Sequence, residues 1–206
     1  MIFFIIVSLF LVVSTQYVDP VLALFIRRTL YSNSVWVRYT SDLPDALLLA
    51  DAVITICAYA GYRIRVNRHI FDAVTKLCLL LAAAMPIAYG AKCLTKFVFG
   101  RVNTRIWLLQ EQVAPSFHWF HGGGDFNGFP SGHMVVFSTL LVALWRFYPR
   151  WNSVYLLAGT ALAVALIATN YHFLGDIVAG GYLGLIVEAA VYRFIQTNSG
   201  TLEPRP

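Results

Sequence analysis

The sequence predicts an all-α integral membrane protein, and three observations support this fold class. Of the 206 residues, 59% are hydrophobic and only 12% are charged, whereas roughly a quarter of the residues in a soluble domain are charged. The mean hydropathy is +0.68. Apolar runs close to the length that crosses a bilayer, roughly 20 residues, recur along the chain. We therefore expect one compact helical bundle in a membrane, a single domain that covers residues 1–206.

Six stretches of the chain are predicted to span the membrane. The N-terminal stretch lacks a basic leader region and a small-residue cleavage site, so we expect a retained first helix rather than a cleaved signal peptide. The fourth stretch is short, unless its first turn lies inside the protein rather than in lipid. The last two stretches abut, which requires a tight turn at one membrane face. The predicted spans are Ile2–Val18, Leu43–Tyr62, His69–Cys93, Pro130–Tyr148, Ser153–Tyr171 and Phe173–Ile195.

Basic residues in the connections predict how the bundle lies in the membrane. Arginines gather in the loops Arg63–Arg68 and Arg146–Trp151 and in the C-terminal tail. With six spans these segments fall on one side, which the positive-inside rule identifies as cytoplasmic. Basic residues on the opposite side weaken this bias, unless four of them have a separate task such as holding an anion. These four are Lys92, Lys96, Arg101 and Arg105.

The net charge of +5 does not predict a nucleic-acid partner. The basic residues occur in short segments between apolar stretches, where membrane topology and anionic headgroups account for many of them. The cysteines Cys57, Cys78 and Cys93 are scattered and form no CxxC pair. This spacing argues against a disulfide framework and against a zinc site, and we interpret the cysteines as small packing residues.

The tetrapeptide Pro-Ser-Gly-His at 130–133 predicts a helix start that attracts an anion. Proline followed by small residues opens a helix well, and the free N–H groups of a first helical turn bind anions with the help of the helix dipole. Ser131 adds a hydroxyl donor, and His133 adds a group that can protonate a leaving oxygen. A plain helix start with a capping serine is the simpler alternative.

Two further pairs of polar residues fall on the same predicted side of the membrane. His172 and Asp176 are four residues apart, so on a helix the carboxylate can hold one imidazole nitrogen and leave the other free to attack. Lys96 and Arg101 flank a predicted helix end, where fixed cations suit phosphate oxygens. Taken alone, each pair is better explained as an interfacial histidine or as side chains that snorkel toward the headgroups. Their shared side with the tetrapeptide supports a single site.

Together the three features resemble the type 2 phosphatidic acid phosphatase (PAP2) superfamily, over about residues 88–184. The family pattern is K-x6-RP, then PSGH, then SR-x5-H-x3-D. PSGH is complete here, and the H-x3-D pair is followed by the family-like sequence Ile-Val-Ala-Gly at 177–180. The resemblance implies a PAP2-like bundle of about six transmembrane helices with its catalytic loops on one side. Because the chain is short and adds no further domain, we expect a bacterial inner membrane, with the active site on the periplasmic face.

The chain departs from the family pattern at two arginine positions. Asn103 and Thr104 stand where the first motif has Arg-Pro, and Ala165 and Leu166 stand where the third has Ser-Arg. Arg105, two residues beyond the expected arginine, is a candidate to supply the missing charge. Sphingomyelin-synthase-like lipid phosphotransferases also carry an H-x3-D motif without the third-motif arginine. The choice between hydrolase and transferase therefore stays open.

The resemblance implies a mechanism that needs neither a metal nor another cofactor. His172 attacks phosphorus, Asp176 orients its ring, and His133 protonates the leaving alkoxide. Water or an alcohol acceptor then attacks the phosphohistidine. On this interpretation the phosphate oxygens are held by Lys96, Arg101, Arg105, Ser131 and Gly132.

We therefore expect a membrane lipid phosphatase that hydrolyses a phosphate monoester or pyrophosphate of a lipid. A lipid phosphotransferase, which passes the group to an alcohol or a sugar, is the first alternative. A non-catalytic lipid-binding or transport protein on the same fold is the second; the lost arginine positions favour it, and the intact His133, His172 and Asp176 oppose it. The expected partners are a lipid phosphate and membrane lipids. The identity of the lipid, the oligomeric state and the organism stay open.

The long connection at 94–129 invites two other interpretations. His118, His121 and Asp125 resemble a metal cluster, but His-x2-His alone is a poor zinc spacing and no second pair follows. We prefer a loop near the headgroups that shapes substrate entry. Elsewhere, Gly180 and Gly184 form a small-xxx-small pair, which predicts close packing of the last helix against a neighbour.

Overall fold

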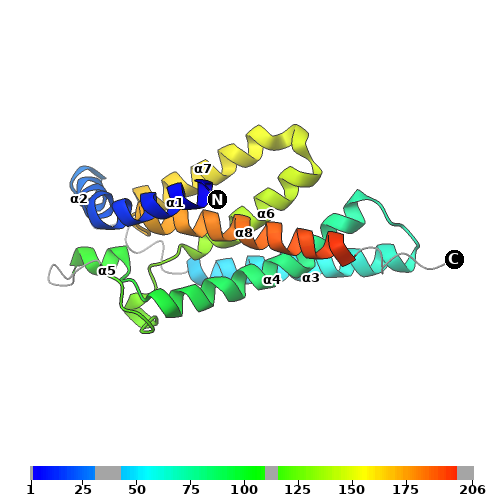
Figure 1. The fold of residues 1–206 in the computed structure, drawn as a ribbon, viewed down its shortest axis with the longest axis horizontal. Coiled ribbons are helices and arrows are strands. Elements are labelled where there is room, and N and C mark those ends of the chain that lie inside the picture. The colour runs from blue at the N-terminus through cyan, green and yellow to red at the C-terminus, as the bar shows by residue number, and fades with distance from the viewer. Residues whose placement is uncertain (1, 31–42, 110–115, 199–206) are drawn as a thin grey trace.

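The computed structural model describes residues 2–30, 43–109 and 116–198, which form an elongated helical bundle (Figure 1). Besides helices, these residues contain one isolated β-bridge, between Arg101 and Phe117. The helices are α1 (Ile2–Val13), α2 (Asp19–Leu30), α3 (Leu43–Asn67), α4 (Ala73–Phe99), α5 (Thr104–Leu109), α6 (Gly132–Phe147), α7 (Asn152–Ala168) and α8 (Leu174–Asn198), with short helical turns η1 (Ser14–Val18), η3 (Gly124–Phe126) and η4 (Pro149–Trp151).

Each of the six predicted spans contains a helix, but the structure does not confirm six crossings. Within the described residues, four helical stretches are long and apolar enough to cross a membrane, and neither α3 nor α6 is among them. α6 is apolar but has only 16 residues. Its first residues, Gly132 and His133, are buried in the protein. The first turn of this short stretch thus lies inside the protein, the arrangement that the sequence analysis allowed for. The four stretches are Ile5–Leu30, Ala73–Phe99, Pro149–Ala168 and Leu174–Asn198.

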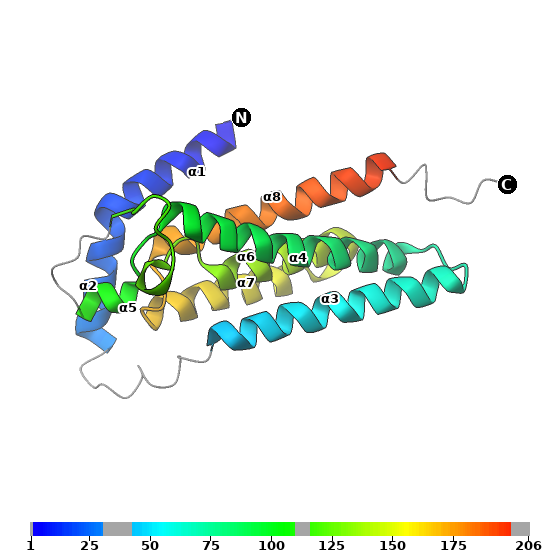
Figure 2. The same cartoon turned by 90° about the horizontal axis from the view of Figure 1, so that it is seen from below.

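The first span is longer than predicted and bent. α1 continues through the π-helical turn η1 into α2, and the two helices point in different directions (Figure 2). Arg27 on α2 donates a hydrogen bond to the Leu108 carbonyl at 2.7 Å, which ties α2 to α5. α2 also contacts α7 and α8. The N-terminal segment therefore packs onto the end of the bundle where α7 turns into α8.

The apolar core lies among α4, α6 and α8, with α3 packed along α4. Leu80, Met85 and Val135 in this core are at most 1% exposed. The outward-facing side chains are also apolar; Leu157 and Phe194, for example, are each 70% exposed. Helices that are apolar on all faces are typical of segments surrounded by lipid.

The α3–α4 connection, one of the predicted basic loops, lies at the end of the bundle opposite α5 (Figure 1). There, the Asp72 carboxylate accepts a hydrogen bond from the Thr75 N–H at 3.0 Å and so caps α4. Arg65 at the end of α3 pairs with Asp72 at 2.5 Å. An N-cap of this kind stabilises a helix by about 1 kcal/mol, and the pair fixes the α3–α4 connection.

α6 and α8 approach closely at Gly180 and Gly184, as the small-xxx-small pair predicted. A Cβ atom at Gly180 would come within 2.5 Å of the Ser131 carbonyl oxygen, and one at Gly184 within 2.5 Å of the Val135 carbonyl oxygen. The close approach allows the Ser131 N–H to donate to the Asp176 carbonyl at 2.9 Å. The starts of the two helices, which carry the second and third motifs, are thereby joined.

An ion pair joins the end of α6 to the middle of α8. Arg146 donates two hydrogen bonds to the fully buried Glu188 carboxylate, at 2.7 and 2.8 Å. Arg146→Ala is expected to lower the free energy of unfolding by about 3 kcal/mol, because it leaves a buried carboxylate without its partner. Thermal unfolding in detergent measures the effect. Arg150→Ala, on the neighbouring turn, is the matched control and is expected to change stability by less than about 0.5 kcal/mol; equal losses would contradict the role of the pair.

Candidate active site

The loop at 116–131 folds back onto the end of α4. Backbone hydrogen bonds run from His118 N–H to the Gly100 carbonyl, from Phe120 N–H to Val98 and from Gly122 N–H to Phe97, at 2.8–3.1 Å. Gly100 ends α4 in the left-handed conformation with φ 50°, which glycine adopts at no steric cost. A Cβ atom there would also overlap the His118 carbonyl oxygen.

An aromatic cluster holds this loop in place. Phe99 at the end of α4 lies between Phe117, Trp119 and Phe129, with ring centroids 5.0–5.8 Å apart. Such pairs contribute about 0.5–1.5 kcal/mol each beyond their burial. The cluster places residues 127–131 beside the end of α4, next to the first motif lysine. These aromatic contacts thus hold the loop at 116–131 against α4.

One pocket brings parts of all three motifs together. Its volume is about 360 Å³. Lys96 comes from α4, Gly132 and His133 from the start of α6, and His172 from the turn before α8. The remaining lining residues are Lys92, Cys93, Phe97, Asn103, Gly122, Asn127 and Tyr171.

His172 is buried and lies in the turn that joins α7 to α8. It precedes the first residue of α8, in the tight turn that was predicted between the last two spans, so His172 and Asp176 do not share a helix. The turn nevertheless brings the His172 Nδ1 atom to 3.7 Å from Asp176 Oδ2. This separation is an electrostatic contact rather than a closed hydrogen bond. Asn170 makes the tight turn with φ 47°, a conformation that asparagine tolerates better than most residues.

Asp176 is fully buried in the first turn of α8 and is held by two donors. Its Oδ2 atom accepts a hydrogen bond from the Phe173 N–H at 3.1 Å. Its Oδ1 atom accepts one from Arg101 Nη1 at 2.6 Å. A carboxylate at a helix N-terminus is also stabilised by the helix dipole. The carboxylate is therefore fixed in orientation toward His172.

Ser131, Gly132 and His133 form the start of α6 at the pocket. The Ser131 hydroxyl is buried, makes no capping hydrogen bond and has no hydrogen-bond partner among the described residues. The His133 ring faces His172 with centroids 6.3 Å apart and Tyr171 with centroids 5.4 Å apart. The two imidazoles are thus edge-on neighbours, and both line the pocket.

Two lysines of α4 supply the positive charge that lines the pocket. Lys96 donates a hydrogen bond to the Asn127 carbonyl, which points its stem along the pocket wall. Lys92, one turn earlier, places its Nζ atom 3.7 Å from the centre of the Tyr89 ring. Its side chain also lies against Gly132, where a Cβ atom would come within 2.7 Å of Lys92 Cδ.

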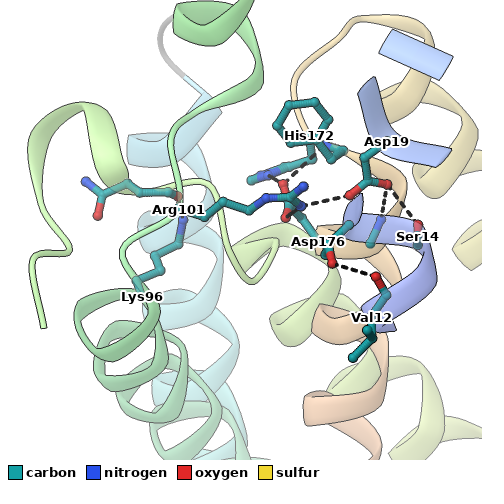
Figure 3. Close-up of polar contacts among 11 residues, drawn as sticks. Val12, Ser14, Asp19, Lys96, Arg101, His172 and Asp176 are labelled. Carbon is teal, nitrogen blue, oxygen red and sulfur yellow. Dashed lines mark hydrogen bonds and ion pairs between the residues drawn. The ribbon is translucent and has the colours of Figure 1, made fainter. Parts of the chain in front are cut away.

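The two predicted phosphate-binding arginines do not line the pocket. Arg101 is fully buried behind His172 and pairs with Asp176 and Asp19 at 2.6 and 2.8 Å (Figure 3). Burial disfavours its charge, but the two carboxylates outweigh that effect and raise the pKa of Arg101. Arg105 donates to the Thr169 carbonyl at 3.2 Å and lies over the Tyr171 ring. This geometry does not support the prediction that Arg101 binds phosphate directly, because its Nη1 atom contacts two carboxylates.

Sequence reasoning missed Asp19 and Tyr171 and did not assign Asn103 to the site. Asp19 interrupts an otherwise apolar run, and an ionisable residue within such a run indicates a function by default. The sequence therefore marks Asp19 as unusual. It does not reveal the contact with Gly175, because the two residues are 156 positions apart. Tyr171 and Asn103 carry no pattern of their own and enter the pocket only through the tertiary fold.

The histidines of the long loop lie apart from the pocket lining. His118 packs against Phe126 with ring centroids 4.7 Å apart, and His121 Nδ1 lies 2.7 Å from the Trp119 carbonyl oxygen. Within the described ranges, no group of three or more histidine, cysteine or acidic side chains is arranged to hold a metal ion.

One comparison with known proteins gives a match. A family model described as the PAP2 superfamily matches residues 74–199, which is more than half of the chain. Neither curated proteins nor solved structures gave a match. The matched range begins at α4 and includes the pocket-lining motifs, whereas α1, α2 and α3 lie outside it.

Proposed function

The chain belongs to the PAP2 superfamily, and on that premise we propose that it is a membrane lipid phosphatase that works through a phosphohistidine at His172. Membership supports phosphatase-type chemistry, and the apolar helices support a membrane location. The observation that carries the proposal is the pocket in which His172 faces His133, with the Asp176 carboxylate behind it.

The proposed reaction consists of two displacements at phosphorus. Because Nδ1 of His172 faces Asp176, Nε2 is the attacking atom. The N–P bond forms as the P–O bond to the lipid breaks, and the leaving oxygen takes a proton from His133. Water then attacks phosphorus and gives a proton to His133, and the N–P electron pair returns to His172. Asp176 stabilises the positive charge on the ring in between.

Lys96, Lys92, the Ser131 hydroxyl and the Gly132 amide are proposed to hold the phosphate oxygens. Both lysines and Gly132 line the pocket. The N-terminus of α6, with its free N–H groups, faces the same space. Arg105 is assigned no direct contact, because it bonds to the α7–α8 turn; we propose that it steadies Tyr171 at the pocket edge.

A lipid phosphotransferase is the second candidate function, and one observation favours it. Among the described residues that line the pocket there are lysines but no arginine, so the pocket offers less bidentate binding to a doubly charged phosphate. Such a site suits a phosphate group of lower charge, passed to an alcohol acceptor.

Phosphate release by the purified protein tests the proposal. We expect release from one or more members of a panel of lipid monophosphates and pyrophosphates in detergent, with a metal chelator present. Release only in the presence of an added alcohol, with a new lipid product, would select the transferase. Binding of lipid phosphates with neither product would contradict an enzymatic function and support a binding protein.

The membrane orientation follows from the same proposal. The α3–α4 connection lies at the end of the bundle opposite α5 (Figure 1), whereas the pocket is lined by Lys96, near the end of α4 that leads into α5. The positive-inside rule therefore places the pocket on the outer face. We propose a bacterial inner membrane with a periplasmic site. A membrane-impermeant thiol reagent is expected to label the pocket residue Cys93 in intact cells in a variant without the other two cysteines.

The pH dependence of kcat/KM is expected to show an acid limb with a midpoint below 6.5. Burial lowers the pKa of His172, against the opposing effect of the Asp176 carboxylate. The neutral imidazole is the attacking form, so a lowered pKa keeps the enzyme active at lower pH. Initial rates between about pH 4.5 and about pH 8 measure the limb. A midpoint at or above the ordinary histidine value of 6.5 would contradict this account.

A further inference from the structure

Arg101 lies between two carboxylates that come from opposite ends of the chain. Its Nη1 atom is 2.6 Å from Asp176 Oδ1 and 2.8 Å from Asp19 Oδ2 (Figure 3). The side chains of all three residues are fully buried. The Arg101 guanidinium also stacks on Phe173, with 4.4 Å from its central carbon to the ring centre. An aromatic ring therefore covers one side of the triad formed by Asp19, Arg101 and Asp176.

Asp19 is itself held in place by two donors. Its Oδ1 atom accepts a hydrogen bond from the Ser14 hydroxyl at 2.9 Å and another from the Gly175 N–H at 2.9 Å. Gly175 lies in the first turn of α8, one residue before Asp176. Asp19 therefore contacts Arg101, the cation that pairs with Asp176, and also α8, the helix on which Asp176 lies. Asp19 and His172 also line the same small cavity.

The charges of the triad explain why a second carboxylate is useful. With Arg101 and Asp176 alone, the guanidinium would neutralise the carboxylate that faces His172. With Asp19 present as a carboxylate, the three groups carry a net charge of −1, and Arg101 is shared between two acceptors. In surroundings of low dielectric constant, this difference of one negative charge strongly affects the protonation of the nearby His172 ring.

We propose that Asp19 is a positioning residue for the reaction at His172: it anchors Arg101 and leaves the Asp176 carboxylate oriented and negatively charged toward the imidazole. The inference rests on the proposed function. It also assigns the N-terminal segment, which lies outside the range matched by the family model, a part in the chemistry. Asp19 touches no substrate and acts through Arg101 and Asp176.

Steady-state kinetics of Asp19→Asn test the inference. Asparagine keeps the size and the ability to accept the Gly175 hydrogen bond but removes the charge. We expect kcat to fall about 10- to 100-fold, the usual cost of losing a supporting contact behind a reacting group, with little change in KM. The acid limb of the pH profile is expected to move to lower pH, because a nearby negative charge raises a histidine pKa and Asp19→Asn removes one.

A charge-balanced double variant separates electrostatics from damage to the fold. In Asp19→Asn with Arg101→Gln, one negative and one positive charge are removed, so the net charge of the triad returns to −1. The acid limb is then expected to return toward the wild-type position. A limb that stays at the single-variant position would overturn the charge argument. The other charged or titratable groups around His172 are unchanged in both variants: Lys96, His133, Tyr171 and Asp176.

Ser14→Ala is a milder variant that keeps the test decisive if Asp19→Asn does not purify. It removes one donor to the Asp19 carboxylate, and kcat is expected to fall about 2- to 5-fold at unchanged KM. Asp72→Asn, which alters the α4 cap at the far end of the bundle, is the matched control and is expected to keep wild-type kcat.

The outcomes distinguish the inference from the proposed function. If the wild type is active, His172→Ala is inactive, and Asp19→Asn has wild-type kcat and pH profile, the role of Asp19 is wrong and the phosphatase proposal stands. If the wild type releases no phosphate, or His172→Ala is as active as the wild type, the proposed function fails and the role of Asp19 fails with it.

Discussion

Replacing His172 with alanine is expected to lower phosphate release by at least about 10³-fold, because loss of a nucleophile removes the covalent route itself. The side chain lies in the pocket between the Asp176 carboxylate and the His133 ring. Binding of the lipid phosphate is expected to persist, since the lysines and the start of α6 are untouched. Initial rates and equilibrium binding on the same purified protein measure the two effects separately.

His121→Ala is the matched control for this variant. His121 is an exposed histidine of the loop at 116–131 and does not line the pocket. We expect its replacement to leave the rate near the wild-type value. A large loss in this control, with activity retained in His172→Ala, would move the chemistry to the loop histidines and contradict the proposed site.

Gly180→Ala is expected to lower both stability and activity. The added Cβ atom would lie 2.5 Å from the Ser131 carbonyl oxygen and 2.9 Å from Met134 Cβ, so α6 and α8 must separate. Overpacking of this kind costs about 1–3 kcal/mol of unfolding free energy. The displacement also weakens the hydrogen bond from Ser131 to the Asp176 carbonyl. Misplacement by about 1 Å can lower the rate about 100-fold.

Gly181→Ala provides the comparison within the same helix. Its Cβ atom would meet only Met134 Cε, at 3.7 Å, which is an ordinary contact. Alanine is also the better helix former by about 1 kcal/mol. Thermal unfolding and phosphate release of the two variants are measured side by side. Equal behaviour of the two variants would show that the α6–α8 approach does not position the site.

The helices that carry the motifs were predicted from the sequence, because apolar runs of spanning length have few alternatives to a helix in lipid. α7 and α8 follow their predicted ranges, Ser153–Tyr171 and Phe173–Ile195, within a few residues. α4 extends to Phe99, beyond the predicted end at Cys93, because Gly100 rather than the drop in hydropathy ends it. The bend between α1 and α2 has no hydropathy signal, and α6, an apolar helix of only 16 residues, is not among the four stretches long enough to cross.

The candidate site was predicted in its motifs but not in its charge arrangement. The pocket contains Lys96, Gly132, His133 and His172, residues that spacing and a shared membrane side had already grouped. Arg101 was assigned to the phosphate because a buried arginine cannot be distinguished from a pocket arginine by sequence. Of its two carboxylate partners, Asp19 lies 82 positions away in the sequence, and packing of α2 onto α8 brings it beside Asp176 and Arg101.

Trapping of the covalent intermediate tests the central claim most directly. The wild-type protein would be mixed with a lipid phosphate labelled in its phosphoryl group, quenched within one turnover and digested. We predict an acid-labile, base-stable label on the peptide that carries His172, and none in His172→Ala. Phosphate release by the wild type with no label on that peptide, or with the label on another residue, would contradict the phosphohistidine mechanism.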